Sequence, residues 1–296
     1  MPTLSRNALI GYPAGIITGV TYGLNPLFAV PLMRQGASIE SILFFRYGFA
    51  VALLAMFLML RRESFGINLR QAAILLVLGV LYTTSSLTLF EAYNYIASGL
   101  ATTLVFLYPV IVAIIMVFLR VVPSWPVWLS IAATFAGVLI MTQGGGSHEV
   151  SPLGVLLSIG SATAYSAFIV IINRSKAIAS VPGTLITFYS LLIGAVIFMS
   201  RSITTGAGIT TGITGAGAWL NLVGLAVFPT IISTATLAVA TRCIGATKAS
   251  VLGVFEPITA ILVGTLVFSE PLTPGIILGI TIAIAAISFM IHATRR

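Results

Sequence analysis

Ten long apolar runs divide this 296-residue chain, and very few charged residues interrupt them. A helix needs about 20 largely apolar residues to cross the hydrocarbon core of a bilayer. The runs are continuous and do not alternate apolar with polar residues, which indicates helices and not the strands of a barrel. Only 7% of the residues are charged, whereas a soluble domain carries about 25%. The sequence therefore predicts an all-α polytopic membrane protein.

The predicted spans are about 8–33, 39–60, 71–96, 98–119, 125–143, 152–173, 183–200, 217–241, 247–269 and 273–293. The first run is longer than the ~7–15-residue apolar core of a signal peptide, and no A-x-A site follows it. We therefore expect it to be the first transmembrane helix.

The basic residues are unevenly distributed over the predicted loops. Eleven fall on the side of the N-terminus, two on the other side, and Arg46 lies within a span. Cytoplasmic loops carry an excess of Lys and Arg, so both termini are expected in the cytoplasm. The net charge of +8 then reflects topology, and we expect no nucleic-acid partner.

An internal repeat appears when the chain is shifted by 148 positions. The segment 101–126 then lies over 249–274, and Pro109 lies over Pro257. We expect two five-helix repeats, residues 1–145 and 146–296. Because five is odd, the second copy is inverted in the membrane. Inverted repeats are typical of secondary transporters, which bind substrate near the midplane between the copies.

The pair Glu256-Pro257 lies in the middle of the ninth span, about nine residues or roughly 14 Å from its inner end. A carboxylate at that depth is expensive and favours a functional role. The prolines predict helix kinks at Pro109 and Pro257, beside a central cavity. The alternative is that Pro257 only kinks the helix and that a neighbouring helix satisfies Glu256.

Three motifs carry a family resemblance: "FFRYGFA" around Arg46, "AYNYIASGLATTLVFLYP" between spans three and four, and "GATKASVLGVFEPITAILVGTLVFSEPLTPGIILG". With these motifs and its two five-helix halves, the chain resembles the drug/metabolite transporter superfamily in its EamA-type form. It is most similar there to the bacterial aromatic amino acid exporters. The resemblance implies ten helices, cytoplasmic termini, a cavity between the halves and export of amino acids. The family often repeats an acidic residue such as Glu270 after span four, but "LRVVPSW" has none there.

Several polar and aromatic residues are candidates for the cavity wall, because an aromatic cavity with a few amides or hydroxyls suits an amphipathic small molecule. The predicted substrate-binding residues are Tyr22, Asn25, Tyr82, Ser86, Tyr108, Tyr165 and Glu256, with Glu256 recognising an amino group. For each aromatic residue taken alone, packing or lipid contact is the better explanation, and only the set on equivalent helices favours a cavity wall. Lys248 is a possible contact at the inner mouth, or a snorkelling anchor at the membrane edge.

Arg46 and Glu91 lie at similar depth, about seven and five residues from the outer ends of spans two and three. Charges buried in membranes pair, so we predict a structural Arg46–Glu91 ion pair in preference to a substrate role. Glycines spaced four apart predict close helix packing along one face of span one: Gly11, Gly15, Gly19 and Gly23.

These features favour a carrier over an enzyme or a channel. The chain has no aspartate and one cysteine, and its two histidines fall at segment ends, so no catalytic, cofactor or metal site is expected. A duplicated chain with one midplane carboxylate fits alternating access better than a pore. The expected partners are a small-molecule substrate, an amino acid, and the lipid bilayer, with the chain a monomer or a weak homo-oligomer. Other efflux substrates, an uncoupled facilitator and proton coupling stay open.

Overall fold

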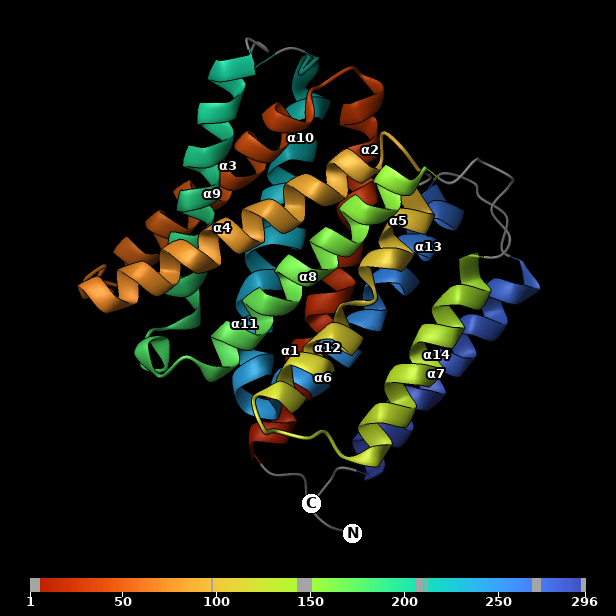
Figure 1. The fold of residues 1–296 in the computed structure, drawn as a ribbon. Coiled ribbons are helices and arrows are strands. Elements are labelled where there is room, and N and C mark those ends of the chain that lie inside the picture. Colours follow the sequence, from red (N-terminus) through yellow and green to blue (C-terminus); the bar gives the residue numbers. More distant parts are fainter. Residues whose placement is uncertain are drawn as a thin grey trace.

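The structure, a computed structural model, describes residues 6–96, 98–142, 151–205, 210, 212–267 and 273–293. All regular elements in these ranges are helices (Figure 1). In chain order they are α1 (Arg6–Gly23), α2 (Asn25–Arg34), α3 (Ile39–Leu60), α4 (Leu69–Ala92), α5 (Ser98–Val105), α6 (Tyr108–Phe118), α7 (Trp125–Thr142), α8 (Pro152–Arg174), η1 (Lys176–Ile178), α9 (Gly183–Thr205), α10 (Gly215–Ala226), η2 (Val227–Ile232), α11 (Ser233–Ile244), α12 (Ala246–Val251), η3 (Leu252–Val254), α13 (Phe255–Val267) and α14 (Pro274–Ala293).

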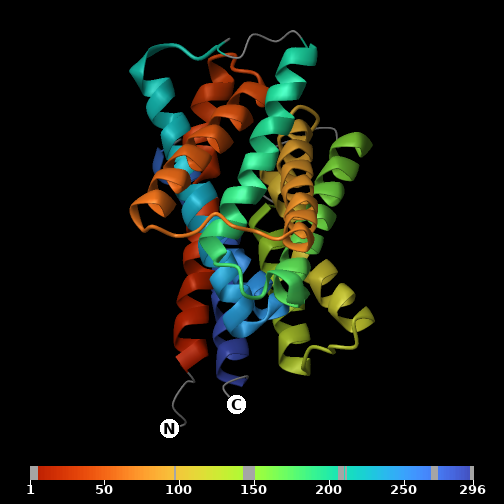
Figure 2. The ribbon, with the colours of Figure 1, turned by 90° about the vertical axis from the view of Figure 1, so that its left-hand side faces the viewer.

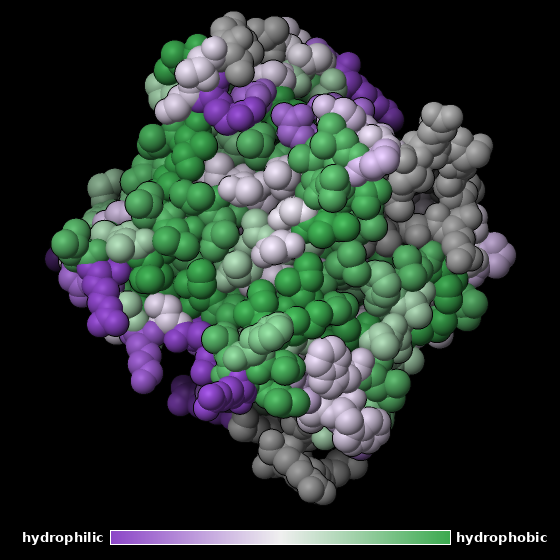
Figure 3. Space-filling model, in the orientation of Figure 1, coloured by the Kyte–Doolittle hydropathy of each residue, from purple (hydrophilic) through white to green (hydrophobic). Residues whose placement is uncertain are grey.

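These elements form the ten predicted spans. Eight continuous helical stretches are long and apolar enough to cross a membrane, and two shorter apolar helices, α6 and the first part of α7, complete the set. Figure 3 shows an apolar surface across the middle of one face, with hydrophilic residues gathered towards its upper and lower edges. The prediction of an all-α, ten-helix, multi-pass membrane protein is confirmed.

Four of the ten spans are broken into shorter pieces, each next to a proline. Spans four and nine break just before Pro109 and Pro257, at equivalent positions of the repeat. Span one breaks at Leu24, before Pro26, and span eight contains a π-helix around Pro229. Proline has no N–H to donate and its ring crowds the preceding turn, so each break has a local cause. The breaks in spans one and eight were not among our predictions.

The two halves pack against each other along their whole length, and the extensive contacts join one helix from each half. α3 packs on α9 and α7 on α14, which are equivalent spans. α1 also packs on α11, and α4 packs on α8. These two contacts are equivalent, because α1 and α8 are the first spans of the two halves and α4 and α11 belong to the third spans. α1 begins and α14 ends on the same side (Figure 2), whereas α8 begins on the opposite side and runs the other way (Figure 1). The repeat is therefore inverted, as predicted. The proposed boundary between residues 145 and 146 lies outside the described residues.

The glycine face of α1 allows close contact with the second half. A Cβ added to Gly19 would lie 2.8 Å from the Cβ of Phe255, and one added to Gly23 would collide with the backbone of Glu256. Such distances require small residues at these positions. The predicted packing role of the glycine stripe is confirmed, and its consequence is that the end of α1 lies directly against the start of α13.

Candidate functional site

A small pocket lies between the two halves at the level of the helix breaks. The first half contributes the end of α1, the start of α2, the end of α4 and α5, and the second half contributes α13. The lining residues are Tyr22, Gly23, Asn25, Pro26, Leu89, Tyr93, Thr102, Glu256 and Ala260. The free space in the pocket is sufficient for about one water molecule. The structure therefore represents a closed form of this site.

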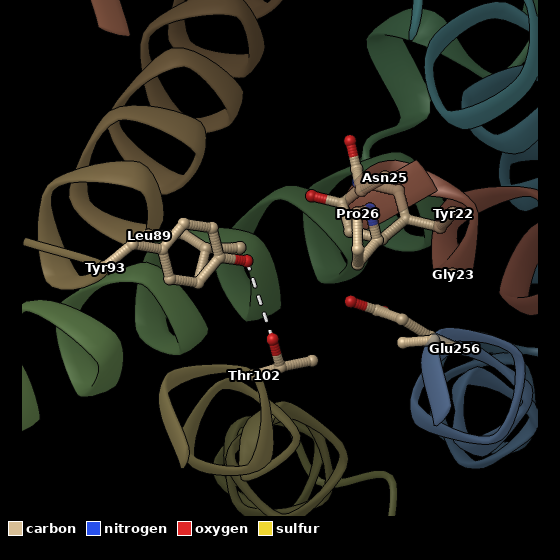
Figure 4. A pocket seen from close by; sticks show the side chains of 9 residues that line it. Tyr22, Gly23, Asn25, Pro26, Leu89, Tyr93, Thr102 and Glu256 are labelled. Atoms are coloured by element: carbon tan, nitrogen blue, oxygen red, sulfur yellow. Dashed lines mark hydrogen bonds between the residues drawn. The ribbon is translucent and has the colours of Figure 1, made fainter. Parts of the chain in front are cut away.

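Glu256 is the charged group of the pocket. Its side chain is only 7% exposed, and Figure 4 shows the carboxylate pointing from α13 into the space before Tyr93 and Thr102. Those two residues are hydrogen-bonded to each other, with 3.5 Å between their hydroxyl oxygens. Within the described part of the chain the Glu256 carboxylate accepts no hydrogen bond and forms no ion pair. The expectation that a neighbouring helix might satisfy it is not met.

Asn25 adds a second acceptor without a donor. Its Oδ1 atom is buried and has no hydrogen-bond partner. Buried acceptors without a donor are costly, because they lose the hydrogen bonds that water would give. Asn25 lines the pocket beside the Glu256 carboxylate, and a carboxylate without a donor suits a ligand with hydrogen-bond donors, such as an ammonium group with its three N–H donors.

The break in span nine explains why a carboxylate is tolerated at Glu256. The 3₁₀ segment η3 ends at Val254, and α13 restarts at Phe255, so Glu256 lies in the first turn of a new helix. The positive end of the α13 dipole lies at this first turn and favours a negative charge there. Pro257 thus helps to create a new N-terminus at the depth where the carboxylate lies.

The predicted tyrosines meet in one buried aromatic cluster. Tyr165 is the centre of it: its ring centroid lies 6.1 Å from that of Tyr22, 5.1 Å from that of Tyr108 and 6.4 Å from that of Tyr82. Of the four, only Tyr22 lines the pocket. The other three form a second layer behind it, between the two halves.

Ser86 has a packing contact in this closed form. Its hydroxyl oxygen lies 2.7 Å from that of Tyr47, and both side chains are buried. Lys248 lies half-buried in the short helix α12 and does not line the pocket. The structure therefore brings Tyr22, Asn25 and Glu256 together at the pocket and leaves Lys248 apart from it.

The predicted Arg46–Glu91 ion pair is wrong. The salt bridge that the described residues form joins Arg201 and Glu40, at 3.3 Å. Glu91 instead accepts a hydrogen bond from the Asn94 amide at 3.2 Å. The sequence predicted a similar depth for the two residues, but depth leaves open which way each side chain points around its helix. Arg46 points towards the second half of the protein.

Sequence reasoning missed two groups of residues. Tyr93 and Thr102 line the pocket, and both belong to the motif "AYNYIASGLATT" that joins spans three and four. The partners of Arg46, Pro229 and Thr230, lie in the π-helix η2. A proline inside an apolar run was the available signal for η2. Glu270 lies outside the described residues.

The comparisons with known proteins agree with this architecture. The model of the EamA-like transporter family matches residues 9–143 and, a second time, residues 152–292. An uncharacterized transporter of Synechocystis sp. is 27% identical over 217 residues, which is 68% of this chain and 61% of that protein. A crystal structure with 18% identity has a TM-score of 0.77 and covers 97% of this chain and 99% of its own. This chain belongs to the EamA-like transporter family.

Proposed function

We propose that the protein is a secondary transporter that exports small amphipathic metabolites, chiefly aromatic and other hydrophobic amino acids, across the bacterial inner membrane. Its termini would lie in the cytoplasm, in line with the excess of basic residues on that side. The observation that carries the proposal is the unpaired carboxylate of Glu256, buried in a pocket between the two halves.

The chemistry of the pocket suits an amino group on an apolar molecule. A carboxylate–ammonium hydrogen bond is charge-assisted and about twice as strong as a neutral one. Asn25 adds a polar amide to the lining, and Tyr22 provides an aromatic wall that continues into the cluster around Tyr165. The apolar part of an amino acid would pack against these rings.

The size of the pocket supports alternating access. Because it holds about one water molecule, an amino acid enters only after helices of the two halves move apart. The breaks in spans one and nine adjoin pocket residues, and the break in span four packs against the one in span nine, so that half-helices on either side of a break can tilt separately. The repeat relates an opening on one side of the membrane to the equivalent opening on the other.

A carrier of lipophilic organic cations is the second candidate. A carboxylate beside aromatic rings also attracts such cations. Transport of a quaternary ammonium compound with no transport of amino acids would support this alternative. Flux that neither saturates nor shows counterflow would instead indicate an uncoupled, channel-like facilitator.

Counterflow in proteoliposomes tests the proposal. The assay loads unlabelled amino acids inside and follows uptake of the labelled compound, with and without a pH gradient. Glu256→Gln keeps the size of the side chain and removes its charge, and we expect transport of phenylalanine to fall about tenfold or more, since hydrogen bonds to charged groups contribute about 1.5–3 kcal/mol.

Glu91→Gln is the matched control, because Glu91 lies outside the pocket and contacts Asn94. We expect it to transport at the wild-type rate. Unchanged affinity and rate in a folded Glu256→Gln protein would contradict the role of this carboxylate. Absence of counterflow with every amino acid in the wild-type protein would contradict the proposed function itself.

A further inference from the structure

Arg46 is a buried cation without a carboxylate partner. Its side chain is 0% exposed in the middle part of α3, and no carboxylate of the described residues lies within 4 Å of it. Charged groups inside a membrane are costly and normally mark pairs, pathways or binding sites. Because Arg46 has no carboxylate partner among the described residues, its burial indicates that it binds a negative group of a ligand.

The hydrogen bonds of Arg46 orient its guanidinium but do not neutralise it. Its Nε donates to the Thr230 hydroxyl at 2.6 Å, and its Nη2 donates to the carbonyl of Pro229 at 3.3 Å. The Thr230 hydroxyl in turn donates to the carbonyl of Leu225 at 2.7 Å. In a regular α-helix this carbonyl would accept from residue 229, but Pro229 has no N–H to donate. The π-helix η2 thus holds one edge of the guanidinium in a fixed position.

The guanidinium lies near two tyrosine rings, with Cζ 5.9 Å from the centroids of Tyr22 and Tyr47, but one of its nitrogen atoms has no acceptor. The Nη1 atom of Arg46 is buried and has no hydrogen-bond acceptor. A guanidinium presents its N–H groups as a planar fork that matches a carboxylate. Nη1, together with the second hydrogen on Nη2, is therefore a ready donor pair for a carboxylate of a ligand.

Tyr22 links this guanidinium to the pocket. The Cζ atom of Arg46 lies 5.9 Å from the centroid of the Tyr22 ring, and Tyr22 lines the same pocket as Glu256. The unpaired cation and the unpaired carboxylate are thus neighbours of one aromatic side chain. The first belongs to span two and the second to span nine, so they come from different halves.

We propose that Arg46 and Glu256 are the two ends of one site for a zwitterion: Arg46 binds the α-carboxylate of the substrate and Glu256 binds its α-ammonium. Displacement of the Tyr22 ring, when the halves separate, gives the carboxylate access to Nη1. The proposal rests on the proposed function and deepens it. A zwitterion pairs both buried charges at once, whereas an organic cation leaves Arg46 unpaired and close to a like charge.

Binding of three matched ligands to the purified protein tests this assignment. Phenylalanine has both charged groups, phenethylamine lacks the carboxylate, and 3-phenylpropionate lacks the ammonium. We expect Arg46→Gln to weaken phenylalanine binding at least about tenfold and not to weaken phenethylamine binding, which tightens if the like charge of Arg46 opposes it. Glu256→Gln should weaken the binding of phenylalanine and leave the binding of 3-phenylpropionate, which has no ammonium, unchanged. Arg201→Lys, at an arginine that is paired with Glu40 and 42% exposed, is the control and should change none of the three.

If Arg46→Gln does not fold, Arg46→Lys, which keeps the charge, tests whether Arg46 binds the carboxylate. Because a lysine lacks the planar fork, it should weaken phenylalanine binding selectively while phenethylamine binding stays at its wild-type value. Equal weakening of phenylalanine and phenethylamine by either Arg46 variant, or no effect on phenylalanine, would show that Arg46 only holds α3 to η2. If the wild-type protein binds none of the three ligands, the amino acid function fails and not merely the role of Arg46.

Discussion

The contact between Gly253 and Tyr108 joins the broken parts of spans four and nine. Gly253 lies in η3, and Tyr108 is the first residue of α6. A Cβ added to Gly253 would overlap the hydroxyl oxygen of Tyr108 and lie 2.6 Å from its Cζ atom. Gly253→Ala therefore forces either the tyrosine ring or the η3 backbone to move.

Neither group has room to move freely. Tyr108 is 3% exposed, and its ring is held by edge contacts with Phe106, at 5.8 Å between centroids, and Tyr165, at 5.1 Å. Overpacking of a well-packed core costs about 1–3 kcal/mol. We expect Gly253→Ala to lower the free energy of unfolding by about that amount, measured by titration from mild detergent into SDS.

A double-mutant cycle separates this clash from a general effect of alanine. Tyr108→Phe removes the overlapping oxygen, so the double mutant should recover part of the loss. Recovery is expected to be incomplete, since Cζ is still 2.6 Å from the added Cβ. Gly160→Ala in α8 is the matched control, because a Cβ there meets nothing within 4 Å, and it should be neutral or slightly stabilising. Strictly additive losses in the cycle would refute the reasoning.

Two further predictions test the topology and the partners of Arg46. In a background without the sole cysteine, single cysteines in residues 62–70 should be labelled from the cytoplasm and those in residues 202–214 from the outside; labelling of residues 62–70 from the periplasm would overturn the topology. Thr230→Val leaves Nε of Arg46 without its acceptor and should cost about 1–3 kcal/mol in the same unfolding titration. Glu91→Ala should change the free energy of unfolding by no more than about 0.5 kcal/mol. A large loss of stability in this variant would support the Arg46–Glu91 ion pair that the structure lacks.

The number, direction and breaks of the spans follow from local features of the chain. A run of about 20 apolar residues spans the bilayer wherever its neighbours lie, and an odd number of spans inverts the second copy. The kinks at Pro109 and Pro257 follow from the missing N–H of proline. The depth of Glu256 follows from the constant rise of a helix, about 1.5 Å per residue. For these reasons the architecture and the approximate site were predictable from the amino-acid sequence.

The rotation of each helix about its own axis was decided only by the tertiary structure. Residues at equal depth can face lipid, a neighbouring helix or the central pocket, and helices that are apolar all round carry little signal of which face turns inward. Arg46 and Glu91 were therefore wrongly predicted as a pair from their similar distance to the helix ends, because Arg46 turns towards Thr230 of the second half. The same freedom places Tyr22 on the pocket and Tyr82 behind it. Packing between the halves, which acts across more than a hundred residues of sequence, sets those rotations.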